Sequence, residues 1–111
     1  MRATGWHNGS ALTDPAGYGI RLTARDRDTY FEPTWKTVTV EMDGHEPAIV
    51  TIAPSFWRSC PELRSADIGR WLLDAQAAPW AKGSPPGIAV ELVADNRFAI
   101  RVLKRRTLGQ R

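Results

Sequence analysis

The chain has 111 residues, of which 42% are hydrophobic and 24% are charged, and it contains five tryptophans and one cysteine. This composition predicts one folded domain and excludes a disordered chain. No apolar run approaches the roughly 18–20 residues of a membrane span, and the first residues lack the apolar stretch of a signal peptide. A single cysteine cannot form an internal disulfide, so we expect a cytoplasmic protein without membrane contact.

The formal net charge of +3 arises at the C-terminal end of the sequence. Residues 104–111 hold four basic residues and no acid, so +3 less 4 leaves the rest of the chain at −1. A charged end of this kind is usually a solubilising tail, and nucleic-acid contact is its functional interpretation. We therefore divide the chain into an N-terminal arm (1–17), one domain (18–103) and a basic tail (104–111).

The first half of the chain alternates turn signals with short periodic segments. Four glycines and a proline in residues 5–19 are typical of an irregular segment, and we expect residues 1–17 to be an irregular arm. Residues 18–22 fit a short strand. Thr23 and Asp26 have the spacing of a capping box, which predicts a helix through about Tyr30 that Pro33 ends.

The middle of the chain predicts a β-hairpin. Residues 35–41 alternate and are rich in β-branched side chains, Asp43 and Gly44 mark a turn, and residues 48–53 form the returning strand. Residues 55–63 fit a short helix broken at Pro61.

One longer helix follows. Ser65 is the expected N-cap, and four apolar residues share one helical face at positions i, i+3, i+4 and i+7: Ile68, Trp71, Leu72 and Ala75. On the opposite face we expect an ion pair between Arg70 and Asp74.

Residues 88–92 and 98–102 then alternate around a turn at 94–96, which predicts a closing hairpin. The order of elements is β–α–β–β–loop–α–β–β. It predicts an α+β, mainly β fold: a small mixed, largely antiparallel barrel with two short helices.

The chain offers little for catalysis. Cys60 stands in an apolar stretch, His7 and His45 are the only histidines, and we expect a structural cysteine. Asp43 and Glu46 flank His45 in a single turn with no second group of ligands, so a solvated turn is the expected role. We therefore expect no enzymatic activity, no cofactor and no metal.

Two groups of residues suit a nucleic acid. Trp57, Arg58 and Arg64 lie between the central hairpin and the longer helix, and Trp6, His7, Asn8 and Ser10 lie in the early arm. Arginines contact phosphates and can make bidentate contacts to guanine. The structural alternative is that the aromatic residues fill the core and the arginines are ordinary surface charges.

The pattern of residues 18–103 resembles the B-three-type DNA-binding pseudobarrel. The resemblance rests on a strand and short helix ending in Tyr30-Phe31, a Lys-x-Val-x-Val strand from Lys36, and a Gly turn followed by Ala48–Ile52. It continues with a helix containing Trp71-Leu72, a bend at 80–83 and the closing hairpin. It implies a seven-stranded open pseudobarrel.

Members of that family include plant transcription factors and effector domains of restriction enzymes, and they grip the DNA major groove with two arms. The resemblance implies a first arm formed by His7, Asn8, Ser10 and Arg21, and a second formed by Trp57, Arg58 and Arg64. The implied partner is double-stranded DNA.

Two alternatives remain open from the sequence. Aromatic richness and a nearly neutral body also fit a protein- or peptide-binding module on the same scaffold. A reader of RNA or of modified bases would use Trp57 or Trp6 as a stacking face.

Overall fold

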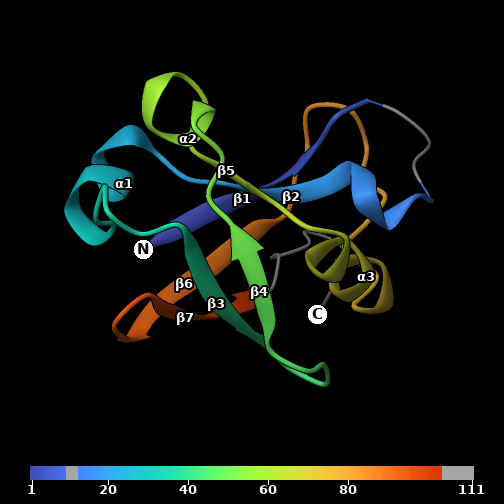
Figure 1. Cartoon of the computed structure of the whole chain (residues 1–111). Helices are drawn as coiled ribbons and strands as arrows, with labels where there is room; N and C mark the ends of the chain where they lie inside the picture. The colour runs from blue at the N-terminus through green and yellow to red at the C-terminus, as the bar shows by residue number, and fades with distance from the viewer. Residues whose placement is uncertain (10–12, 104–111) are drawn as a thin grey trace.

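The computed structural model describes residues 1–9 and 13–103 (Figure 1). Seven strands form one mixed sheet that curls into a nearly closed barrel, so the predicted mainly β, α+β class is confirmed. The strands are β1 (Arg2–His7), β2 (Tyr18–Arg21), β3 (Thr37–Met42), β4 (Ala48–Thr51), β5 (Glu62–Arg64), β6 (Gly87–Ala94) and β7 (Arg97–Val102). The helices are the 3-10 turn η1 (Pro15–Gly17), α1 (Ala24–Tyr30), α2 (Ser55–Arg58) and α3 (Ala66–Asp74).

The strands follow the order β4-β3-β7-β6-β1-β2-β5. Every pair is antiparallel except β3 and β7, which run parallel. The two outermost strands, β4 and β5, approach each other, and α2 lies in the chain between them. None of the described helices combines the length and apolar character that crossing a membrane requires.

The core fills the barrel from the inward positions of each strand. In β3, Val38, Val40 and Met42 are buried and alternate with more exposed Thr37, Thr39 and Glu41, as a half-buried strand requires. Phe31, at the end of α1, stacks on Phe98 of β7 with ring centroids 4.7 Å apart. The β3–β4 and β6–β7 hairpins that the sequence predicts are both present.

The longer helix forms as expected, with two differences. The Ser65 hydroxyl caps α3 by accepting from the backbone N–H groups of Asp67 and Ile68, and three of the four predicted apolar residues are buried. Ala75 is exposed because the helix ends at Asp74. Arg70 pairs with Asp67, one turn earlier, rather than with Asp74.

Asp74 instead faces the β3–β4 turn, where its Oδ2 lies 3.1 Å from Nε2 of His45. The expected solvated turn is thus tied to the end of α3. Cys60 is half-buried rather than part of the core.

The expectation of an irregular N-terminal arm is wrong for residues 2–7. They form β1, which lies inside the sheet between β6 and β2. Its buried positions carry Ala3 and Gly5, and a Cβ on Gly5 would come within 2.9 Å of atoms of Pro86 and Trp80. Close packing therefore selects small residues here, and small residues give no apolar alternation to detect.

The segment before α3 also differs from the prediction. The expected helix over 55–63 is only one turn long, α2, and residues 62–64 form β5 on the edge of β2. Arg64 therefore stands on a strand and not in a loop.

Candidate nucleic-acid interface

The outer face of β1, β2 and β5 carries two rows of paired residues. Trp6, Gly19 and Arg64 form one row across the three strands, and Thr4, Arg21 and Glu62 form the next. Successive side chains of a strand point to opposite faces, so both rows share the outer face while the residues between them enter the core. Two arginines that the sequence places 43 positions apart thus become neighbours.

Glu62 joins these arginines. It is a buried carboxylate, only 5% exposed. Its Oε2 accepts hydrogen bonds from Nε of Arg21, at 2.8 Å, and from Nη2 of Arg21. Its Oε1 accepts from Nη2 of Arg64 at 3.3 Å. A buried charge needs such partners, and this one receives two.

Both arginines nevertheless remain open to solvent. Their side chains are 53% and 51% exposed for Arg21 and Arg64, against 2% for that of Glu62. The three side chains together carry a charge of +1, and the exposed part of this group is the two guanidinium groups, which the buried carboxylate holds in place.

Gly19 lets the backbone of β5 lie close to β2. A Cβ at Gly19 would collide with the carbonyl oxygen of Leu63 and lie 2.9 Å from Cα of Arg64. With no side chain in the middle of the row, the guanidinium group of Arg64 reaches the ring of Trp6, where its Cζ is 4.9 Å from the ring centroid. This is a cation–π contact, and together with the hydrogen bond to Glu62 it restricts the position of the Arg64 side chain.

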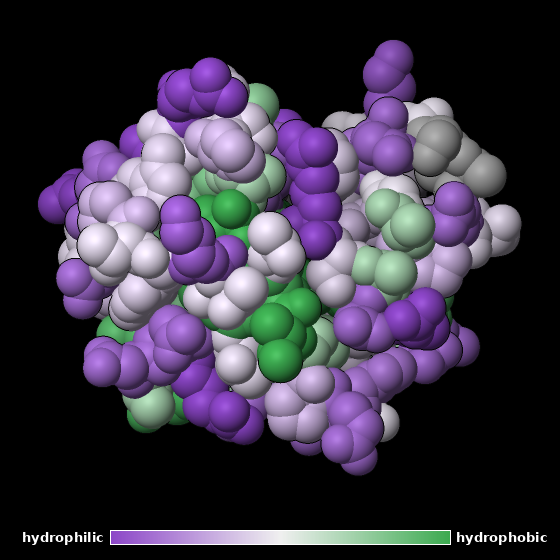
Figure 2. All heavy atoms as spheres, in the orientation of Figure 1, coloured by the Kyte–Doolittle hydropathy of each residue, from purple (hydrophilic) through white to green (hydrophobic). Residues whose placement is uncertain are grey.

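Two segments flank this face. In Figure 1, α2 and the chain that follows β1 lie above the crossing of β1, β2 and β5. Figure 2 shows strongly hydrophilic side chains in the hollow between them. On the same view, hydrophobic atoms reach the surface over β4, where Ile49 is 73% exposed.

Two of the predicted contact residues, His7 and Asn8, lie where β1 passes into the first of these segments. His7 ends β1, and its ring lies 5.2 Å from that of Trp80. Its Nδ1 accepts from the backbone N–H of Gly9 at 3.0 Å, so the neutral ring carries its proton on Nε2, as a donor. Asn8 is exposed, and Ser10 lies outside the described residues.

The second segment is arranged differently from the prediction. Trp57 is half-buried, with Phe56 at 5.5 Å on one side and Cζ of Arg27 at 5.6 Å from its ring. Its indole nitrogen is buried and has no hydrogen-bond partner in the described part of the chain. Trp57 is therefore a packing residue, whereas Arg58, at the end of α2, is exposed.

The structure thus brings Arg21 and Arg64 together and leaves Trp57 aside. Sequence reasoning missed Glu62 and Gly19. Glu62 and Arg64 are two positions apart, which places them on one face of any strand, but that signal appears only once β5 is recognised.

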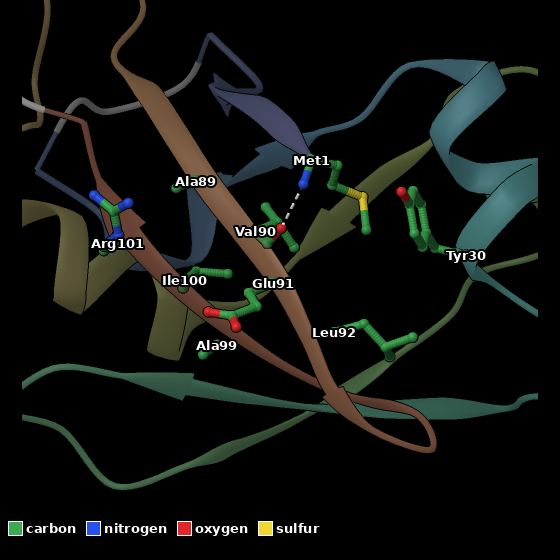
Figure 3. A pocket seen from close by; sticks show the side chains of 9 residues that line it. All are labelled: Met1, Tyr30, Ala89, Val90, Glu91, Leu92, Ala99, Ile100 and Arg101. Atoms are coloured by element: carbon green, nitrogen blue, oxygen red, sulfur yellow. Dashed lines mark hydrogen bonds between the residues drawn. The ribbon is translucent and has the colours of Figure 1, made fainter.

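A second feature lies on the outer face of β6 and β7 (Figure 3). Ala89 and Ala99 leave room there for a groove of about 550 Å³. Tyr30 and Leu92 are exposed beside it, and the N-terminal amine of Met1 donates to the carbonyl oxygen of Val90 at 2.8 Å.

Comparisons with protein-family models, with curated proteins and with solved structures found no match. Within residues 1–9 and 13–103, no three His, Cys, Asp or Glu side chains are grouped as metal ligands would be.

Proposed function

We propose that this chain is a non-catalytic DNA-binding domain that contacts the major groove of duplex DNA, in the manner of the B-three-type pseudobarrels that it resembles. One observation carries the proposal: Arg21 and Arg64 stand side by side on an outer strand face, half exposed and fixed by a buried carboxylate. Guanidinium groups suit both phosphates and guanine edges because they offer several N–H donors in one plane.

The surroundings of this face support the proposal. The segment after β1 and helix α2 lie on either side of it, as the two arms of the resembling family do. Each brings a polar side chain, Asn8 on one side and Arg58 on the other, and both are exposed. The seven-stranded, nearly closed barrel is the architecture that the resemblance implies.

The proposal is tested by titrating labelled random-sequence duplex with the protein and following fluorescence anisotropy at several salt concentrations. Single-stranded DNA and RNA serve as competitors. We expect a linear fall of log affinity with log salt, because phosphate contacts release counterions. A protein ending at Leu103 has to retain this binding. Absence of binding by that shortened protein at low salt would refute the assignment of the face.

Single variants locate the contact. Arg64→Ala removes one guanidinium group and should weaken binding, lowering the salt slope by about 0.9 if that group contacts a phosphate. The matched control is Arg97→Ala, which removes an arginine paired with Glu41 on the outer face of β7, away from the site. Equal effects of the two substitutions would show that only overall charge matters. Thermal melts of both variants establish that they remain folded.

The groove on β6 and β7 favours a second candidate, a peptide-binding module. Its size is that of a small-ligand pocket, and exposed Leu92 and Tyr30 offer apolar contact. Ala99→Trp would fill it. If an immobilised peptide panel yields a ligand that the unmodified protein binds and Ala99→Trp does not, while duplex DNA fails to bind, the second candidate replaces the first.

A further inference from the structure

We infer that Glu62 is a positioning residue that turns Arg21 and Arg64 into a preorganised reader of guanine. The inference rests on the proposed DNA-binding function and deepens it, because it names the base that the site recognises. It also gives a role to a buried acid that a purely electrostatic interface would not need.

The hydrogen bonds of Glu62 leave donors free on both arginines. A guanidinium group has five N–H donors. Glu62 takes the Nε and Nη2 side of Arg21 and one Nη2 hydrogen of Arg64. Among the described residues no other hydrogen bond uses these groups, so three N–H donors of Arg21 and four of Arg64 remain for a ligand, Nη1 of each included. A bidentate contact to O6 and N7 of guanine uses two such donors from one guanidinium plane.

The planes of these groups are also constrained. Arg64 is held at one nitrogen by Glu62 and over its Cζ by the ring of Trp6, 4.9 Å away. Arg21 is held at two nitrogens by the same carboxylate oxygen. Side chains that are ordered before binding lose less conformational freedom on binding, which favours contacts that depend on direction.

The charge of the site argues for a base edge over a phosphate. Glu62 reduces the combined charge of the three side chains to +1, and its own negative charge disfavours a nearby phosphate. Contacts to phosphate position a protein without reading sequence, and they gain from charge more than from orientation. Glu62 lowers the net positive charge of the site and fixes the orientation of the two guanidinium groups, which suits recognition of a base edge.

The test begins with duplexes enriched from a random library by the unmodified protein. In the enriched duplex, each guanine is replaced in turn by 7-deazaguanine, which lacks the N7 acceptor. We expect affinity to fall at one or two positions by at most about 5- to 140-fold, the range for a whole bidentate contact, because the analogue loses N7 and keeps O6. Equal affinity at every position, or a library without enrichment, would overturn the inference.

Glu62→Gln separates positioning from charge. The substitution removes one negative charge, so binding to random duplex should be unchanged or tighter, whereas the penalty for 7-deazaguanine should shrink towards 1-fold. The matched control is Glu41→Gln, which also removes a carboxylate paired with an arginine on the outer face of the sheet. It should leave both quantities unchanged. A full 7-deazaguanine penalty in Glu62→Gln would overturn the inference.

Arg64→Lys provides the answer should Glu62→Gln fail to give a cooperative melt. It keeps the charge and loses the planar fork of donors. We expect binding to random duplex to persist and the 7-deazaguanine penalty to shrink at one position, because a lysine ammonium can reach N7 but lacks the planar pair of donors. An unchanged penalty would contradict the assignment. If the unmodified protein binds no duplex at all, the proposed function itself fails, which is distinct from binding without base discrimination.

Discussion

Replacing Gly69 by alanine sets two opposing effects against each other in α3. Alanine is the better helix former, by about 1 kcal/mol. However, a Cβ at this position would lie 2.7 Å from the carbonyl carbon of Pro15 and 2.8 Å from its Cα, and closer still to its oxygen. These are backbone atoms of η1, which cannot rotate away as the end of a side chain could.

The steric effect should prevail. Overpacking costs about 1–3 kcal/mol, and contact with backbone belongs in the upper part of that range. We therefore expect Gly69→Ala to lower the free energy of unfolding by about 1–2 kcal/mol, measured by urea denaturation with tryptophan fluorescence. The control is Arg70→Ala, an exposed neighbour whose loss should change stability by no more than about 0.5 kcal/mol.

An unchanged or increased stability of Gly69→Ala would refute this reasoning. It would mean that η1 does not rest on α3 as closely as the structure shows, and the segment that follows β1 would lose its support. That segment flanks the proposed DNA-binding face, so the measurement bears on the site as well as on the fold.

Two further substitutions probe the core. Trp71→Ala removes a ring that is only 4% exposed and should lower the free energy of unfolding by about 3–5 kcal/mol. This is a large part of the roughly 5–15 kcal/mol by which a domain is typically stable. A thermal melt like that of the unmodified protein would contradict the role of α3 in the core. Burial raises the pKa of the Tyr18 phenol above its ordinary value of 10.0. The neutral phenol therefore contributes its full stabilisation of the fold below pH 10, and this stabilisation is lost as the pH rises through the raised pKa. Tyr18→Phe should therefore give a shallower alkaline decline of stability in urea titrations between pH 8 and 11, and superimposable declines would show that the phenol does not contribute.

The elements that the sequence predicts correctly are those with a local signal. Residues 37–42 and 48–51 alternate around a Gly turn, and α3 has both a serine cap and an apolar stripe. Strand β1 has neither, because its buried residues are Ala3 and Gly5. Strand β5 is only three residues long and exists because β2 offers it an edge. Such elements are set by tertiary packing, which one sequence does not display.

The same division holds for the candidate site. The resemblance and the charge pattern single out Arg21 and Arg64 individually. The two arginines lie side by side because of the register in which β2 pairs with β5, and no local sequence pattern encodes that register. Trp57 illustrates the opposite case: a tryptophan beside an arginine suggested a binding surface, but the ring packs against Phe56 and Arg27. That this face binds DNA stays a prediction.

The position of β1 inside the sheet has a consequence for synthesis of the chain. β1 pairs with β6, which leaves the ribosome roughly 80 residues later, a delay of about 4–16 s at translation rates of roughly 5–20 residues per second. Until then one edge of β1 has no strand to pair with, and the parallel β3–β7 pair has not formed either. Pairings between distant segments form slowly and leave strand edges open to other chains. The barrel therefore cannot close before β6 and β7 have been synthesised, and nascent chains stalled before Gly87 should be the form most prone to aggregate and most dependent on chaperones.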